Sequence, residues 1–242
     1  MKTFPMLTLV VGALLPGGLL AQLPSASADM QSLSVQQTVD PIFPRRLIEL
    51  GVTEGEAEVA ISSDASGKLV ELLVVGYTQP EFADAVVTAI KEWKFEPARL
   101  RGTPVGTVVQ LAFHFEAKGV VVSSVGLFDQ FEGRLLRISQ GRFLYWPCSL
   151  RELDRLPMAT VTVAPHYSSA LAERGVKGRV TVEFFIDETG TVRMPAGSAH
   201  DDATLTALAI EALSQWKFAP PTSRGKGVLV KASQEFNFRN GG

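Results

Sequence analysis

The side chains that could carry chemistry are few and scattered along the sequence. Three histidines are present: His114, His166 and His200. No two of them stand four positions apart, as a pair of metal-binding histidines on one helix would, and none has a carboxylate at ligand spacing. The chain contains no Gly-x-Ser-x-Gly elbow, phosphate-binding loop or dinucleotide fingerprint. We therefore expect no enzyme activity, no metal site and no small-molecule cofactor.

The acidic residues and the single cysteine that stand out fit structural roles better than chemical ones. Asp64 and Asp187 each stand three residues before a glycine, in a tight turn where the carboxylate accepts hydrogen bonds from nearby main-chain N–H groups. The pair at 201–202 precedes a predicted helix and fits a helix cap better than a cation site. Cys148 has no basic neighbour or helix start that would activate its thiol, so we expect a packed small residue.

The strongest pattern in the chain is an internal repeat. Trp-Lys-Phe-Glu-Pro at residues 93–97 recurs as Trp-Lys-Phe-Ala-Pro at residues 216–220, an offset of 123 positions. The same offset relates Gly55 to Gly178 and Phe115 to Phe238. The residues that we expect to define the shared structural motif, with both tryptophans in the cores, are Trp93, Phe95, Pro97, Trp216, Phe218, Pro220, Gly67 and Gly190. A register kept over about 75 residues indicates a duplication, and therefore two domains of one kind.

Size and composition narrow the class of protein. The chain has 242 residues, so each copy can bury a modest core without disulfides or metals. One cysteine cannot form an internal disulfide. Charged residues make up 20% of the chain and the net charge is −2, which leaves no basic excess to bind phosphates. We therefore expect no nucleic-acid partner.

The first 28 residues resemble a secretory signal peptide. Lys2 gives the positive start, residues 7–15 form an apolar run, and the small residues before Ala28 form a cleavage site. Cleavage after Ala28 predicts a periplasmic or secreted protein. The alternative is an uncleaved anchor in the inner membrane, because residues 4–21 are almost wholly apolar. That span is short for a bilayer, which needs about 20 residues, and its prolines and glycines weaken it as a helix.

Hydrophobic periodicity predicts the same element order in both copies. In the first copy a short helix is followed by two strands, a long amphipathic helix and a last strand, expected at residues 43–50, 57–62, 69–75, 80–93 and 105–116. In the second copy the corresponding elements are expected at residues 168–174, 179–186, 191–194, 203–216 and 228–239. Residues 29–40 are rich in Ser and Gln, and we expect a flexible lead-in. Residues 118–157 suggest a structured bridge with short strands at 120–122, 127–131, 135–138 and 143–146.

This order of motifs resembles the TonB carboxy-terminal domain. The residues that carry the resemblance are Phe43-Pro44 opening a short helix, Gly55 before a strand, the Asp-x-x-Gly turn at 64–67, and Trp93 to Pro97. The second copy departs where Ser168 replaces the proline and Ala219 replaces the glutamate. The resemblance implies an α+β fold of two domains, 41–117 and 158–239, joined by the bridge. Each would be a three-stranded antiparallel sheet with two helices on one face (α-β-β-α-β).

The resemblance also implies a binding function. In this family the last strand is a sheet edge that accepts an extended peptide from an outer-membrane receptor, which is β-strand addition. The partner would be such a receptor peptide, another envelope protein, or a second copy of the chain. The docking strands would be residues 107–115 and 230–238. Their solvent-facing residues, which would select the partner, are Val108, Gln110, Ala112, His114, Lys231, Ser233, Glu235 and Asn237.

Three functions remain open from the sequence. The first is a periplasmic protein-binding module. The second is an energy-transducing component of transmembrane transport, held by an uncleaved amino-terminal anchor; only 14 residues separate Ala28 from Phe43, about 50 Å when extended, and no Pro-rich spacer lengthens them. We expect binding without energy transduction for that reason. The third is a structural or self-associating envelope protein whose last strands pair with each other or across a dimer.

Overall fold

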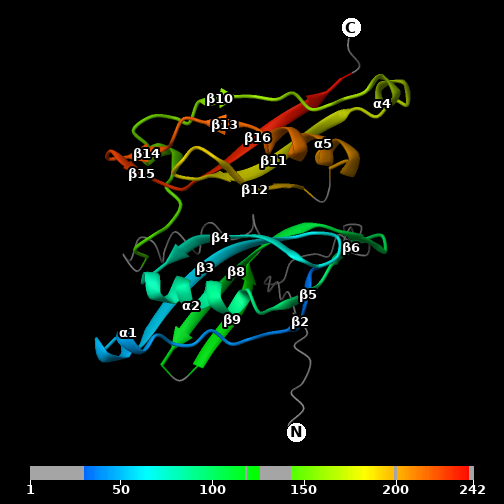
Figure 1. The fold of residues 1–242 in the computed structure, drawn as a ribbon. Helices are drawn as coiled ribbons and strands as arrows, with labels where there is room; N and C mark the ends of the chain where they lie inside the picture. The colour runs from blue at the N-terminus through cyan, green and yellow to red at the C-terminus, as the bar shows by residue number, and fades with distance from the viewer. Residues whose placement is uncertain (1–29, 118, 126–142, 199–200, 240–242) are drawn as a thin grey trace, which may run out of the picture.

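The computed structural model describes residues 30–117, 119–125, 143–198 and 201–239. Figure 1 shows two units of mixed helix and strand, one above the other, each built around an antiparallel sheet. The predicted fold class, an α+β chain with two similar domains, is confirmed.

The first unit has one strand more in its main sheet than we expected. Its principal elements are α1 (Arg45–Glu49), β3 (Glu54–Ser63), β4 (Leu69–Tyr77), α2 (Pro80–Ile90), β8 (Thr107–Glu116) and β9 (Gly119–Val125). The strand order is β4-β3-β8-β9, and all neighbours are antiparallel. The fourth strand, β9, forms because the chain reverses directly after Glu116 and pairs Gly119 with that residue. The predicted strand at residues 120–122 therefore belongs to this sheet.

Short strands hold the beginning of the first unit in place. They are β1 (Met30–Gln31), β2 (Ser34–Gln37), β5 (Lys94–Glu96), β6 (Ala98–Leu100) and β7 (Thr103–Val105). β1 pairs with β6, and β2 pairs with β5. The expectation of a flexible lead-in is therefore wrong for residues 30–37. Helix α2 also ends three residues before Trp93, so Pro97 separates two strands and does not terminate a helix.

The second unit repeats this architecture with three strands in its main sheet. Its elements are β10 (Ala159–Val161), α4 (Ser169–Glu173), β11 (Gly178–Ile186), β12 (Val192–Gly197), α5 (Ala203–Leu213), β13 (Lys217–Phe218), β14 (Thr222–Ser223), β15 (Lys226–Gly227) and β16 (Val230–Phe238). The main sheet has the order β12-β11-β16, and β10 pairs with β13 as β2 pairs with β5. The cap of α5 is as predicted: the Asp202 carboxylate accepts hydrogen bonds from the N–H groups of Thr204 and Leu205.

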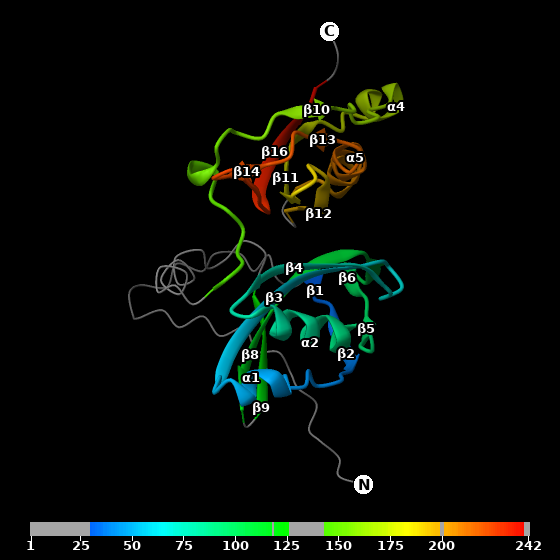
Figure 2. The same cartoon turned by 60° about the vertical axis from the view of Figure 1, so that its left-hand side comes forward.

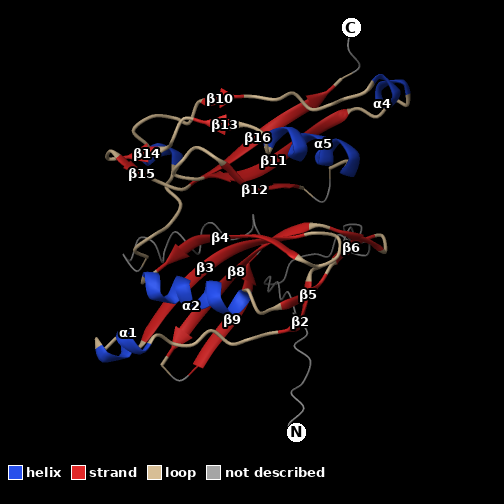
Figure 3. Cartoon of the chain, viewed as in Figure 1, coloured by secondary structure: helices blue, strands red, loops and turns tan. Residues whose placement is uncertain are grey.

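Each helix layer covers one face of its own sheet (Figure 3). In the first unit, alternate residues of β3 pack with an apolar stripe of α2 and with Leu47 of α1; the largest buried members are Ile61, Phe82, Ile90, Phe113 and Phe115. In the second unit, alternate residues of β11 pack with α5 in the same way. The period of two along a strand and 3.6 along a helix brings these apolar faces together.

The two units contact each other through the sheet faces that the helices leave uncovered. A third apolar cluster contains Ala60, Leu73 and Val75 from the first sheet. From the second unit it contains Phe185, Met194 and Leu229. Arg193 of β12 forms an ion pair with Glu71 of β4 and lies 3.4 Å from the Asp187 carboxylate. In Figures 1 and 2 the second unit lies above β4, and α2 lies on the other side of that sheet.

The described part of the bridge runs between the two units. The ring of Tyr145 stacks on Tyr77 with centroids 5.2 Å apart, and its hydroxyl donates a 2.6 Å hydrogen bond to Glu188 of the second unit. Burial and the Glu188 carboxylate together raise the pKa of Tyr145. Residues 150–152 form a 3-10 turn that Ser149 caps. A single β-bridge at Tyr145 replaces the predicted strand at 143–146, and the strands predicted at 127–131 and 135–138 lie outside the described residues.

Candidate partner-binding edge

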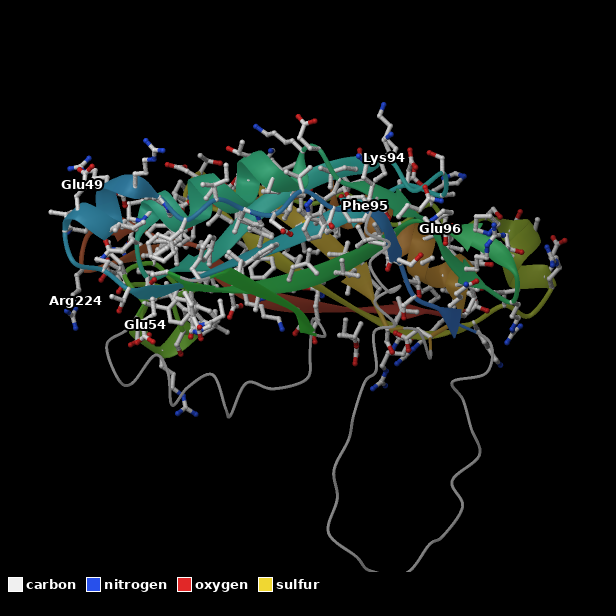
Figure 4. All side chains as sticks on the ribbon, turned by 90° about the horizontal axis from the view of Figure 1, so that it is seen from below. Glu49, Glu54, Lys94, Phe95, Glu96 and Arg224 are labelled. Carbon is white, nitrogen blue, oxygen red and sulfur yellow. The ribbon has the colours of Figure 1, made fainter. Side chains whose placement is uncertain are left out.

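In each unit the repeated motif brings a turn glycine into close contact with the main chain of the Trp-Lys-Phe segment. In the first unit, Gly67 has a φ of +83° and lies so close to the pentapeptide that a Cβ atom would come within 2.5 Å of the Phe95 carbonyl oxygen. Gly190 has a φ of +82° and approaches Phe218 in the same way. Only glycine fits both the backbone conformation and the contact. Figure 4 labels the three residues of β5, in which Phe95 is buried between the exposed residues Lys94 and Glu96.

The tryptophans of the motif hold the segment that follows the first short strands of each unit. The indole Nε1 of Trp93 donates a 2.8 Å hydrogen bond to the carbonyl oxygen of Val39, and Trp216 makes the same bond to Val163. Trp93 is 8% exposed, and Trp216 packs partly buried against the second core. Each indole ring therefore packs against the core of its own unit and also makes a polar contact that periodicity does not reveal.

In the first unit the predicted docking strand is already paired on both sides. β8 lies between β3 and β9, and its register with β9 runs from Gln110 opposite Val125 to Glu116 opposite Gly119. The N–H and C=O groups that an incoming strand would need are engaged by a segment of the same chain. The expectation that residues 107–115 form an open edge is therefore wrong, because β9 closes it.

The proposed selector residues of β8 do not face solvent as a set. Gln110 is 4% exposed, and its Nε2 donates a 2.8 Å hydrogen bond to the buried carboxylate of Glu58. Val108 packs against the third apolar cluster, and Ala112 is half-buried. His114 keeps 38% of its side chain exposed, with Nδ1 3.6 Å from Glu56. These side chains lie on the sheet face that turns toward the second unit, which explains why the sequence pattern alone placed them in solvent.

In the second unit the equivalent strand has a different surrounding. β16 pairs with β11 in an unbroken register from Val230 opposite Ile186 to Phe238 opposite Gly178. On its other side, the described residues supply one contact at its start, where the N–H of Cys148 donates to the carbonyl oxygen of Leu229 and residue 148 forms a parallel bridge with Val230. Beyond Val230 no other described strand pairs with this edge.

The direction of the main-chain groups on β16 follows from that contact. In a strand, successive residues direct their N–H and C=O groups to opposite edges. Because the Leu229 carbonyl points to the outer edge, the main-chain groups of Ser233, Glu235 and Asn237 point there as well. The intervening residues direct their groups to β11. We call Ser233, Glu235 and Asn237 the outer-edge residues.

The side chains along this edge are polar and carry both signs of charge. The three outer-edge side chains are exposed. Glu235 lies 3.5 Å from Arg179 of β11, and Lys231 lies 3.1 Å from Glu183 of the same strand. These are cross-strand pairs on a partly solvated face, and each contributes little to stability. The predicted selector residues of the second unit are therefore accessible at Ser233, Glu235 and Asn237, whereas Lys231 is half-buried.

The surroundings of Asp64 and Cys148 fit structural roles and not catalytic ones. Hydrogen bonds from the Ser66 side chain and main chain lower the pKa of Asp64. Partial burial raises the pKa of the Cys148 thiol, which disfavours its reactive thiolate form.

Among the described residues, no group of three or more His, Cys, Asp or Glu side chains could hold a metal ion. Within the same ranges, no helix is both long and apolar enough to cross a membrane.

Comparison with known proteins defines the family. The family model described as the Gram-negative bacterial TonB protein C-terminal matches residues 39–117 and 163–239, one segment in each unit. The chain belongs to this family and carries two tandem copies of its domain. A curated relative is the protein TonB of Vibrio cholerae serotype O1 (strain ATCC 39315 / El Tor Inaba N16961), which is 30% identical over 88 residues. The match spans 36% of this chain and 36% of that relative.

Proposed function

We propose that this chain is a protein-binding module of the bacterial cell envelope, in which the second unit recruits an extended polypeptide by β-strand addition to β16. The observation that carries this proposal is the difference between the two copies. β8 is paired on both sides by strands of the same chain, whereas the described residues pair β16 on one side only, beyond Val230. An edge strand with a row of available N–H and C=O groups is the main-chain requirement for strand addition.

Two further features support a dedicated edge. The outer-edge residues include no proline, and the one charge among them, on Glu235, faces Arg179 of β11, so no proline removes an N–H from this edge. The first unit also supports the second sheet, since the third apolar cluster, which includes Leu229 just before β16, and the Arg193–Glu71 ion pair join the two sheets. A pre-organised edge loses less conformational entropy on binding than a mobile segment does.

Location in the envelope is part of the proposal. The TonB family membership supports it, and the signal-like segment ending at Ala28 supports export. That segment lies outside the described residues, so cleavage and anchoring remain alternatives. Mass spectrometry of the mature protein separates them: a chain that begins at Asp29 fits a periplasmic or secreted module, and an intact amino terminus fits an inner-membrane anchor. We propose the cleaved form.

The test of function is a proline substitution at the edge. Glu235→Pro removes an N–H that points outward, so the β11 pairing is kept while strand addition is blocked. The matched control is Glu235→Ala, which removes the same side chain and its contact with Arg179 but keeps the N–H. Partners cross-linked to the full chain in an envelope fraction should be lost with Glu235→Pro and retained with Glu235→Ala. Equal recovery with both variants, each shown to be folded by circular dichroism, would contradict the proposal.

A further inference from the structure

Strand β8 shows how a neighbouring strand pairs with the last strand of this domain, because β9 is already paired with it. β8 and β16 are structurally equivalent, because Gly55 stands opposite Phe115 in the first sheet and Gly178 stands opposite Phe238 in the second. The repeat offset of 123 positions relates Gly55 to Gly178 and Phe115 to Phe238. The contacts of β9 with β8 can therefore be transferred to the outer edge of β16.

The pairing of β9 has a definite register over the aromatic residues of β8. Val120 stands opposite Phe115, and Val122 stands opposite Phe113. The side chain of Val120 packs against the first core. The strand Gly119–Val125 consists of valine, serine and glycine only and carries no charge. The register of β9 thus places valine opposite two core phenylalanines at two alternate positions.

The equivalent phenylalanines of the second unit are less completely covered. Phe113 and Phe115 are 1% and 0% exposed, whereas Phe236 and Phe238 are 8% and 5% exposed. Tyr167 packs on Phe238 with ring centroids 5.5 Å apart, as Phe43 packs on Phe115 at 6.2 Å. The second core has the same layout as the first but has no covering strand among the described residues.

We infer that the strand bound by β16 carries two aliphatic residues at alternate positions, which lie beside Phe236 and Phe238 and complete the second core. The inference rests on the proposed function, because it specifies the partner of the same edge. The partner residue between these two stands opposite Asn237, and its neighbour on the same face stands opposite Glu235, near Arg179. Small polar side chains suit that charged and solvated face; in the first unit, Ser123 stands opposite Ala112. β9 runs antiparallel to β8 because a tight turn joins the two strands. The comparison of β9 with the partner strand therefore predicts the spacing of the partner's side chains but not the direction in which the partner runs.

Two synthetic peptides of identical composition test the spacing. Ser-Thr-Val-Thr-Val-Thr-Ser places both valines on one face of a strand, and Ser-Thr-Thr-Val-Val-Thr-Ser places them on opposite faces. Binding of each peptide to the full chain is measured by titration, and NMR shifts of the Phe236 and Phe238 amides locate the site. The alternating peptide should bind about tenfold more tightly, since the isomer leaves one valine side chain unburied.

Variants separate a failure of the spacing from a failure of edge binding. Both peptides should lose affinity with Glu235→Pro and keep it with Glu235→Ala. Equal affinity of the two peptides that still depends on the residue 235 main chain would overturn the inferred spacing and leave edge binding intact. Absence of binding by both peptides overturns the inference. The proposed function is then decided by the envelope cross-linking described above.

Discussion

Trp93 and Val39 are joined by a 2.8 Å hydrogen bond from the indole nitrogen to the main-chain carbonyl oxygen, and Trp216 and Val163 repeat this bond at the same distance. In each unit the bond ties the helix-to-strand junction to the segment that enters the domain. It explains why a pentapeptide with Trp at its first position recurs in both copies. The residue completes an apolar core with its ring and holds the incoming chain with its N–H.

Replacing Trp93 with Phe keeps an aromatic ring in the core and removes the hydrogen bond. The carbonyl of Val39 then loses a partly buried partner, which should cost about 1–2 kcal/mol in the free energy of unfolding. Hydrogen exchange should accelerate in β2, whose pairing with β5 begins close to this bond. Trp216→Phe is the matched control, because it should loosen β10 and leave β2 unchanged. If either variant accelerates hydrogen exchange equally in β2 and β10, the two tryptophan hydrogen bonds do not act independently.

The turn glycines provide a test of the contact with the pentapeptide. Gly67→Ala and Gly190→Ala place a Cβ against a main-chain carbonyl at a positive φ, and each should lower the free energy of unfolding by more than about 2 kcal/mol. Gly102→Ala and Gly225→Ala serve as controls, since these glycines have φ values of +80° and +72° but no atom within 4 Å of the added Cβ. Chemical denaturation of all four variants makes the comparison. Equal losses at the four positions would mean that the backbone conformation alone matters.

The acid sensitivity of the second unit depends in part on Asp187. Partial burial acts to raise the pKa of its carboxyl group, but hydrogen bonds from Thr189 and Thr191 and the contact with Arg193 outweigh that effect and hold the pKa below its ordinary value. A lowered pKa in the folded state stabilises the fold above the pKa of the unfolded chain. That stability is lost as the pH falls through the folded value. The free energy of unfolding should therefore decline below about pH 4.

Asp187→Asn removes this titration and should flatten the acid limb of the curve of stability against pH. The measurement is chemical denaturation at a series of pH values from neutral to strongly acidic. Asp64→Asn is a useful companion, because the Asp64 pKa is also lowered while its carboxylate accepts hydrogen bonds from Ser66 and Lys68 of its own turn in the first unit. If the free energy of unfolding of Asp187→Asn falls with decreasing pH as steeply as that of the unmodified chain, the Asp187 carboxylate does not cause the acid sensitivity.

The contact between the two units should depend on Leu73. This residue is 9% exposed and belongs to the third cluster, on the face of β4 opposite the first core. Leu73→Asp places a charge in that contact, so the units should separate while each retains its own core. Small-angle scattering should report a larger radius of gyration. Val70→Asp on the same strand is the control, because Val70 is 66% exposed and its substitution should leave the radius unchanged.

The sequence predicted well those features that depend on side-chain periodicity and on the repeat. The 123-residue offset anticipated the equivalence of Gly55 with Gly178, which the sheet registers confirm. Alternation along β8 correctly separated Leu111, Phe113 and Phe115 from the other face. It could not show that the second unit covers part of that other face, because the contact joins residues about 120 positions apart in the chain.

Strand pairing was harder to predict than strand position. The sequence predicts a strand at residues 120–122, but side-chain types do not identify the strand with which a main chain pairs. The prediction therefore places these residues in the bridge, whereas they pair with β8. β2 has an all-exposed burial pattern and gave no periodic signal. It is held by main-chain pairing with β5 and by side-chain hydrogen bonds from Ser34 and Gln36 to Glu96. Such contacts depend on which segments meet in space.

The most direct test of the proposed binding edge is residue-resolved amide hydrogen exchange of the full chain, alone and with a cross-linked or titrated partner. In the free chain the outer-edge amides of Ser233, Glu235 and Asn237 should exchange rapidly, while the alternate amides of β16 that point to β11 exchange slowly. When the partner is bound, the outer-edge amides should become protected. A bound partner that leaves these three amides as fast as in the free chain would contradict strand addition at β16.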